Sequence, residues 1–434
     1  MNVKTTKTLC GMLAMLAFCA CSSNHDNVGD GQHFWKVSLD ASMGEATTRT
    51  LTAGEGNAIN ASFAQNDAVV VVDADGSTIV GTLYAETAGA STTLTGTLDA
   101  ATLAAGEVVT LRYLSATANY DGQVGTLAGI SAHQDYAEGT LTVSTTEPLT
   151  FTSNSVTLLA KQSITKFSFT DGTSPVAVKT FGIATTGLVQ SIATSGSERV
   201  GAVTGTPATA SADVYVALRN KSGEKQTYTF TVKDDAGNWF TGTKKANLAN
   251  GKNYATSVTL TQLPALTGSS DVGTIGVVDG LPAIIVVDNY ETKKAVALMN
   301  VGALCPEHYG AYYTFADQAS GLTGSWYVPA PTELVSLAAV SNTWGAQNGV
   351  NGRLFTISEG KTLFLPAAGY IDNDPDDNDA TPLLFDVSTY GHYWSSTSLK
   401  DDMASSFRFS NNSINSYSEY KVNALSVRPF HALP

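Results

Sequence analysis

Apolar and polar residues alternate in short runs along most of this chain. In the run 34–40, the side chains of Trp35, Val37 and Leu39 fall on one face, and the polar side chains between them fall on the other. A period of two residues is typical of a β-strand that buries one face. We therefore predict a half-buried strand at residues 34–40.

Between residues 50 and 262 the same alternation recurs in short runs that are separated by turn-forming residues. Asp75-Gly76, Asp121-Gly122 and Asp171-Gly172 are such turn signals, and their spacing is typical of a β-sandwich. We predict a mainly β chain with two tandem β-sandwich domains, residues 50–155 and 156–262. The predicted strands are 68–73, 108–114, 140–144, 155–160, 164–170, 176–183, 212–218, 226–233 and 253–261.

Residues 263–271 break this pattern and are predicted to be a linker, because Leu263–Ser270 contains proline, glycine and serine. The following residues, 272–434, are predicted to form a third domain of a different kind. Thr332 is the predicted N-cap of a helix, with Glu333 in its first turn and apolar residues at helical spacing after it. This part also contains Trp326, Trp344 and Trp394.

The N-terminus has the features of a secretory signal, because Lys4 and Lys7 give a positive start that an apolar stretch follows. Residues 1–20 are therefore predicted to be a signal peptide. The residues before Cys21 resemble a bacterial lipoprotein cleavage box, which implies that Cys21 carries a lipid. The alternative is an ordinary signal peptide whose cysteines are incidental. After acylation of Cys21, Cys305 is the only thiol left, so no disulfide within the chain is predicted.

Composition limits the classes of function. The formal net charge is −14 and only 14% of residues are charged, against roughly 25% in an average soluble protein. Small and β-forming residues fill the difference, which is typical of an extracellular β protein. A sequence pI near 4.8 disfavours nucleic acid as a partner, because phosphate backbones are repelled. Beyond the N-terminus, no apolar run reaches the roughly 18–20 residues that span a bilayer.

Residues 272–434 contain an ordered series of motifs that resembles a FISUMP-type domain. The motifs are Ala297–Ala303 with Pro306–Gly310, Trp326 followed by Val328–Glu333, Phe364–Tyr370, Tyr393–Thr397 and Ser426–Pro429. The resemblance implies a compact α+β module with a C-type-lectin-like fold on a bacterial surface.

The order of the parts before this domain resembles a fimbrillin, the pilus subunit of Bacteroides-type bacteria, and implies transthyretin-like sandwiches. A lipidated Cys21 is followed by a tether with a lone strand, residues 21–49, and then by the two β domains. The resemblance implies that a trypsin-like protease cuts between Arg49 and Thr50. Removal of the leader strand would open a groove that a strand of a neighbouring subunit fills. The alternative is that Arg49 is an ordinary loop arginine and that the strand stays in place.

Candidate ligand contacts lie in the C-terminal part. Trp344, in a predicted loop, offers a flat face to a sugar ring, and Gln347, Asn348 and Asn351 offer amide hydrogen bonds. The acidic stretch 372–379 has oxygen groups that suit calcium, but it lacks the glycine and terminal glutamate of an EF-hand. We predict that this stretch is a solvated acidic loop and that the chain binds no metal.

Motifs of catalysis and cofactor binding are missing from the sequence. It contains no Gly-x-Ser-x-Gly elbow, no CxxC pair, no HExxH helix and no phosphate-binding glycine loop. We therefore predict that the protein is not an enzyme and uses no cofactor.

These inferences predict a fimbrial subunit at the tip of the fimbrium that adheres to a host or microbial surface glycan or protein. The tip position is expected because Ser426–Phe430 is predicted to be a strand of the C-terminal module, so it is not free for donation. Predicted partners are other fimbrial subunits, through donor-strand exchange, and the outer membrane, through the lipid anchor before maturation. The expected location is the cell outer membrane, then the cell-surface fimbrium. The alternative is a glycan-binding surface lipoprotein that never polymerises.

Overall fold

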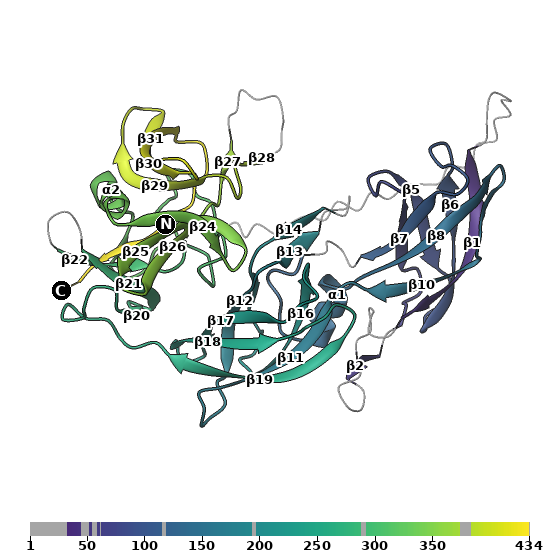
Figure 1. Ribbon diagram of the computed structural model, residues 1–434, viewed down its shortest axis with the longest axis horizontal. Helices are drawn as coiled ribbons and strands as arrows, with labels where there is room; N and C mark the ends of the chain where they lie inside the picture. The colour runs from purple at the N-terminus through teal and green to yellow at the C-terminus, as the bar shows by residue number, and fades with distance from the viewer. Residues whose placement is uncertain are drawn as a thin grey trace, which may run out of the picture.

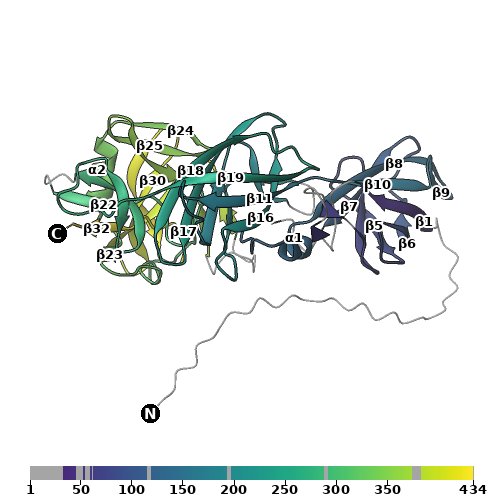
Figure 2. The same cartoon turned by 90° about the horizontal axis from the view of Figure 1, so that it is seen from below.

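The computed structural model describes residues 33–44, 52–53, 59–60, 62–114, 119–192, 197–287, 292–373 and 383–433. These residues form three bodies that follow one another along the long axis of the molecule in both views (Figure 1, Figure 2). Almost all regular structure is β-strand, which confirms the prediction of a mainly β chain. No helix in the described ranges is both long and apolar enough to cross a membrane.

The first domain is built on one sheet that closes on itself. The strand order is β10-β1-β6-β5-β4-β7-β8-β9, and β10 also pairs with β8. Alternate apolar side chains, such as Leu83, Leu94 and Leu111, fill the interior. The strands are β1 (Phe34–Met43), β4 (Ala68–Val72), β5 (Ile79–Ala85), β6 (Ser91–Asp99), β7 (Val108–Leu114), β8 (Tyr136–Thr146), β9 (Leu149–Phe151) and β10 (Ser155–Ala160), with β2 (Thr52–Ala53) and β3 (Ile59–Asn60) as a separate pair.

The boundary between the first two domains differs from the predicted one between residues 155 and 156. Strand β10 starts at Ser155 and pairs with both β1 and β8, so it belongs to the first domain. The second domain begins with β11 at Ser163. Because the alternation of β10 continues almost without a break into β11, the sequence pattern does not indicate which sheet each strand joins.

The second domain is a nine-stranded sheet in the order β14-β13-β16-β11-β19-β18-β17-β12-β15. Its core contains the rings of Phe167, Phe169 and Phe230, and the centroids of Phe167 and Phe230 lie 5.1 Å apart in an edge-to-face pair. The strands are β11 (Ser163–Thr170), β12 (Val178–Ala184), β13 (Leu188–Ile192), β14 (Glu198–Val200), β15 (Val203–Gly205), β16 (Asp213–Asn220), β17 (Gln226–Asp234), β18 (Trp239–Ala246) and β19 (Asn253–Gln262).

The C-terminal module combines several small sheets with one helix, α2 (Pro331–Ala339). The largest sheet has the order β20-β21-β22-β32-β23 and consists of β20 (Ile275–Val278), β21 (Leu281–Val287), β22 (Lys293–Ala297), β32 (Phe430–Ala432) and β23 (Trp326–Tyr327). The others are β24 (Asn342–Gln347), β25 (Val350–Ser358) and β26 (Lys361–Pro366); β27 (Tyr370–Asp372) and β28 (Leu383–Phe385); and β29 (Gly391–Ser398), β30 (Met403–Phe409) and β31 (Ile414–Tyr420). The C-type-lectin-like fold and the transthyretin-like sandwiches remain predictions.

Helix α2 exists as predicted but begins earlier. Its N-cap is Ala330 and not Thr332, and Pro331 occupies the first turn. Proline fits there because its fixed φ suits a helix and its missing N–H would have no partner. The Glu333 carboxylate accepts a hydrogen bond from the Ala330 amide at 2.9 Å and therefore satisfies the helix start without a polar cap side chain.

The predicted linker, residues 263–271, packs against the C-terminal module. The Leu266 amide donates to the Val277 carbonyl at 2.8 Å, and the Val277 amide donates to the Pro264 carbonyl at 2.7 Å. The Leu266 side chain is buried in the core of the module. Trp239 of the second domain donates from Nε1 to the Gly280 carbonyl at 2.8 Å, so the two bodies are joined directly as well.

Residues 119–135, here called the crossover segment, connect β7 and β8 of the first domain but pack against the second. Tyr120 and Ile130 belong to the core of the second domain. Gln123 donates to the Ala217 carbonyl and accepts from the Ala217 amide, each at 2.8 Å. The segment also contains helix α1 (Leu127–His133), which the sequence pattern does not predict.

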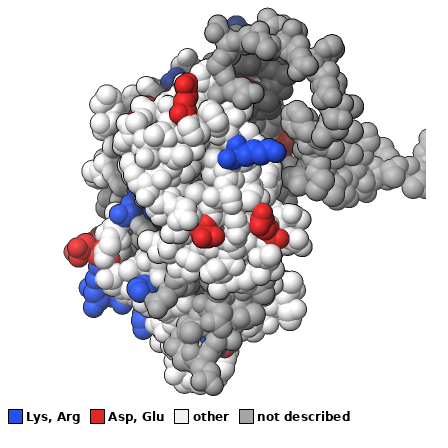
Figure 3. Space-filling model, turned by 90° about the vertical axis from the view of Figure 1, so that its right-hand side faces the viewer, with Lys and Arg blue, Asp and Glu red and all other residues white. Residues whose placement is uncertain are grey.

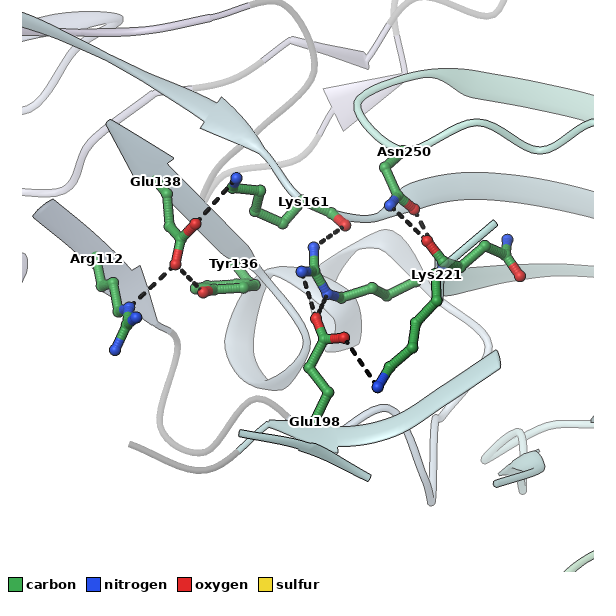
Figure 4. Close-up of polar contacts among 9 residues, drawn as sticks. Arg112, Tyr136, Glu138, Lys161, Glu198, Lys221 and Asn250 are labelled. Atoms are coloured by element: carbon green, nitrogen blue, oxygen red, sulfur yellow. Dashed lines mark hydrogen bonds and ion pairs between the residues drawn. The ribbon is translucent and has the colours of Figure 1, made fainter. Parts of the chain in front are cut away.

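A chain of charged contacts continues the connection between the first two domains (Figure 4). The Glu138 carboxylate on β8 forms ion pairs with Arg112 Nε at 3.0 Å and with Lys161 Nζ at 2.9 Å. The Lys161 carbonyl accepts from Arg219 Nη1 at 2.7 Å, and Arg219 pairs with Glu198 of the second domain. Lys161, which lies between the sheets of the first two domains, is therefore bonded to Glu138 of the first domain and to Arg219 of the second.

Candidate functional site

Strand β1 lies in the sheet of the first domain at one end of the molecule (Figure 1). Its residues Phe34–Ser42 pair antiparallel with Ser91–Asp99 of β6. On the other side, only Asp40–Met43 pair with another strand, in parallel with Ser155–Leu158 of β10. The strand therefore completes the sheet between β6 and β10, although its first half has hydrogen-bonded neighbours on one side only within the described chain.

The side chains of β1 alternate as the sequence predicts. Val37, Leu39 and Ala41 are 9%, 3% and 3% exposed and belong to the core of the first domain, whereas Lys36 and Ser38 point to solvent. Full burial of a valine or leucine side chain contributes about 1.5–3 kcal/mol. Loss of this strand would leave an apolar groove along β6 that only another alternating strand could fill with equal burial.

The end of β1 lies beside an open hollow. A pocket of about 460 Å³ is lined by the last residues of β1, including Asp40 and Ser42, together with Thr92 on β6 and Ser155 and Thr157 on β10. Figure 3 shows the end of the molecule that the first domain forms, where uncharged side chains predominate among the coloured residues and acidic and basic ones are scattered. This face suits contact with another protein chain, because few charges would lose their hydration there.

Cys21, Arg49 and Thr50, the residues of the predicted lipidation and maturation sites, lie outside the described residues. β1 ends at Met43, and the amide of Gly44 donates to the Leu158 carbonyl at 2.8 Å. The predicted cleavage position therefore follows the strand by only a few residues.

Trp344 is in strand β24 and not in the predicted loop. Its ring is half-buried, packs against the core of the C-terminal module and lies 6.4 Å from the Phe409 ring, measured between centroids, in an edge-to-face arrangement. The side chain therefore has a packing role, which uses part of the flat surface that a sugar would need.

The amides predicted to bind a ligand are used within the protein. Gln347 Nε2 and Asn348 Nδ2 both donate to Glu307 Oε1, at 2.8 and 2.7 Å. Asn351 Nδ2 donates to the Ser388 carbonyl at 3.1 Å. The structure thus brings Gln347 and Asn348 together, but around the buried carboxylate of Glu307, which no sequence motif marks.

Glu307 is buried where the C-terminal module meets the second domain. Burial raises the pKa of this carboxyl, and the hydrogen bonds from Gln347 and Asn348 only partly oppose the rise. Asn348 also reaches Thr229 of the second domain, at 3.4 Å. The two amides therefore hold an interdomain acid in place.

The acidic stretch 372–379 is described only at Asp372 and Asn373. Asn373 Nδ2 donates to the Val422 carbonyl at 2.9 Å and so holds the start of the stretch on the module. In the described part of the chain, no group of three His, Cys, Asp or Glu side chains is arranged to hold a metal ion.

A family model for a domain of unknown function, DUF8237, matches residues 344–430. No curated protein matches the chain. Among solved structures, the chain is similar to a candidate cell adhesion protein of Bacteroides uniformis, at 14% identity over 52% of this chain and 96% of that one, with a TM-score of 0.29. It is also similar to a fimbrial assembly protein of Parabacteroides distasonis, at 11% identity over 60% of this chain and 99% of that one, with a TM-score of 0.26. Scores of this size do not establish a shared fold.

Proposed function

We propose that this protein is a fimbrial subunit in which β1 is a removable leader strand, and that a strand of another subunit takes its place. The observation that carries the proposal is the position of β1 between β6 and β10, with Val37, Leu39 and Ala41 in the core. The strand comes first among the described residues and is followed closely by Arg49. A single cut there would separate it from the rest of the sheet.

Strand addition would use two kinds of contact. The backbone groups of β6, freed over Ser91–Asp99, would bond to the incoming strand, and the places of Val37, Leu39 and Ala41 would accept alternate apolar side chains. The backbone hydrogen bonds contribute affinity for any strand, and the places for apolar side chains select the sequence and register of the incoming strand.

The C-terminal module would be the adhesive end of the subunit. It lies at the end of the molecule opposite to β1, so a neighbour attached at the β1 position would leave it projecting (Figure 1, Figure 2). The strand predicted at Ser426–Phe430 is found only from its last residue, because β32 is Phe430–Ala432 and Ser426 forms an isolated bridge with Tyr393. β32 pairs on both sides, with β22 and β23, and its Phe430 is buried, so this strand is not free to be donated. These features support a position at the fimbrial tip.

Lipidation at Cys21 and an outer-membrane anchor before maturation complete the proposal. A Cys21→Ser variant would then leave the membrane fraction, and retention there without acyl labelling would contradict the anchor. The second candidate, a glycan-binding lipoprotein that never polymerises, would keep residues 21–49 at the cell surface.

N-terminal sequencing of the protein in purified fimbriae tests the proposal. The expected first residue is Thr50. A polymer whose subunits begin at Cys21 would contradict leader removal, and protein that begins at Cys21 and occurs only in the membrane fraction would support the second candidate.

A further inference from the structure

A polar pocket of about 240 Å³ lies where the crossover segment, the second domain and the C-terminal module meet. The crossover segment contributes Asn119 and Asp121, and the second domain contributes Gln190, Ser191 and Arg199. The C-terminal module contributes His308, Tyr309, Gly310 and Tyr312. Junctions between domains are frequent positions of ligand sites.

Arg199 carries a charge that the described part of the chain leaves uncompensated. Its guanidinium carbon lies 4.7 Å from the centroid of the Tyr309 ring, so the group is stacked on an aromatic face. Its Nε is buried without a hydrogen-bond partner. The adjacent Glu198 is used elsewhere, since it pairs with Arg219 and with Lys221.

The other charged groups of the pocket are already matched to each other. His308 Nδ1 accepts from the Gly310 amide at 3.2 Å, which leaves Nε2 to donate to Asp121 Oδ2 at 2.9 Å. The second carboxylate oxygen of Asp121 receives the amide of Thr204 at 3.1 Å. Arg199 is therefore the group in the pocket that lacks a counter-charge.

The remaining wall is made of groups that bind hydroxyls. Gln190 is buried and its side-chain amide forms no hydrogen bond among the described residues, and Ser191 and Asn119 are beside it. Asp121 Oδ1 accepts from both the amide and the hydroxyl of Thr204, whereas Oδ2, which in the described part of the chain accepts from His308 alone, can also accept from a hydroxyl group of a ligand. A ligand with an anionic group alone would be repelled by Asp121. A ligand that also carries hydroxyl groups would pair its anionic group with Arg199 and bond its hydroxyls to Asp121 and Gln190.

We propose that this pocket binds a sugar carboxylate, that is, the terminal acidic residue of a glycan. The carboxylate would lie on Arg199, and ring hydroxyls would bond to Gln190, Ser191 and Asp121. The volume is below the roughly 300–1,000 Å³ of sites for drug-sized ligands, so the pocket holds one residue and not a longer oligosaccharide. This site is separate from Trp344, and it does not depend on strand exchange.

Isothermal titration of the full chain with glucuronate, glucose and acetate tests this inference. Glucuronate combines the charge of acetate with the hydroxyls of glucose, so it is expected to bind more tightly than either. Arg199→Gln should weaken glucuronate binding at least about tenfold, because a hydrogen-bonded ion pair is lost. Lys361→Gln, which removes an exposed positive charge elsewhere in the C-terminal module, is the matched control and should bind as the wild type does.

Gln190→Met, which keeps the side-chain volume, should also weaken glucuronate binding while leaving the melting temperature close to that of the wild type. It tests the pocket independently if Arg199→Gln fails to fold. Equal binding of acetate and glucuronate would reduce the site to a plain anion site and overturn the inference. Equal binding of glucose, or no heat with any of the three probes, would overturn it as well.

Discussion

His308 of the C-terminal module donates to Asp121 of the crossover segment at 2.9 Å, across 187 positions of sequence. The contact joins the last body of the molecule to a segment that starts and ends in the first. Because Tyr120, next to Asp121, is buried in the second domain, this one hydrogen bond involves all three parts of the chain. The junction therefore behaves as a shared interface between the three bodies.

Asp121→Asn should lower stability at neutral pH by about 1–2 kcal/mol, in the range of hydrogen bonds to partly exposed charged groups. Burial opposes ionisation, but the hydrogen bonds from His308 and Thr204 hold the pKa of Asp121 below its ordinary value of 3.8. The carboxylate therefore contributes stability that is present above pH 3.8 and is lost as pH falls through its lowered pKa. Urea unfolding of both proteins from pH 7 to pH 3 should show the difference shrinking; a constant difference would contradict this.

Glu307 should have the opposite pH dependence. Its pKa is raised by burial above the ordinary value of 4.5, so the folded state binds more protons than the unfolded state between these two values. Stability relative to Glu307→Gln should then fall as pH rises through this window. The midpoints of urea unfolding of the wild type and of Glu307→Gln, compared between pH 4.5 and pH 8, measure the effect.

Glu307→Leu is the companion variant, because it removes the acceptor of Gln347 and Asn348. Leaving the Gln347 amide without its acceptor, and the Asn348 amide with only its long contact to Thr229, should cost about 1–3 kcal/mol at every pH. If Glu307→Leu were as stable as Glu307→Gln, the two amides would have no structural role, and their use as ligand contacts would become the better explanation.

Trp344→Ala should destabilise the protein by about 2 kcal/mol, less than the 3–5 kcal/mol of a fully buried tryptophan, because the ring is half-buried. Thr343→Ala, the exposed neighbour on the same strand, should stay within about 0.5 kcal/mol of the wild type. Thermal unfolding compares the two. An unchanged melting temperature in Trp344→Ala would contradict the packing role and favour contact of the Trp344 ring with a ligand.

Much of the β structure could be predicted because its cause is local. Alternation with a period of two is a property of the strand itself, so the predicted strands 108–114 and 155–160 coincide with β7 and β10, and 226–233 is one residue shorter than β17. The same pattern predicts that the side chains of Val37 and Leu39 point toward the core, where they are buried.

The parts that could not be predicted depend on partners far along the chain. Asp121-Gly122 has the composition of a turn, but the segment crosses to another domain because Tyr120 and Gln123 find their contacts there. The amides of Gln347 and Asn348 look available for a ligand until the fold brings Glu307 beside them. A long gap between two strong strand patterns, as between β7 and β8, is the one sequence signal that indicates a crossover.

Protein cleaved after Arg49 and freed of its leader should rebind a synthetic peptide of residues 33–44. In this peptide Leu39→Asp should abolish binding, because position 39 faces the core, whereas Ser38→Asp should have little effect, because position 38 faces solvent. Fluorescence anisotropy of labelled peptides measures both. Equal binding of the two variants would mean that the peptide does not occupy the β1 position.

A disulfide that ties β1 to β6 tests strand exchange most directly. Ser38 and Thr95 are register partners, and so are Thr82 and Thr97 on the other side of β6. Cysteines at the first pair would hold the leader in place after cleavage, whereas cysteines at the second pair form a control bridge of the same kind that leaves β1 free. Cys305 is buried and should not compete.

In cells that build fimbriae, we expect the Ser38→Cys, Thr95→Cys double variant to be cleaved yet to remain outside the polymer until a reductant is added. The Thr82→Cys, Thr97→Cys control should assemble with or without the reductant. Assembly of the oxidised Ser38→Cys, Thr95→Cys protein at the level of the control would contradict the proposal that another subunit replaces β1.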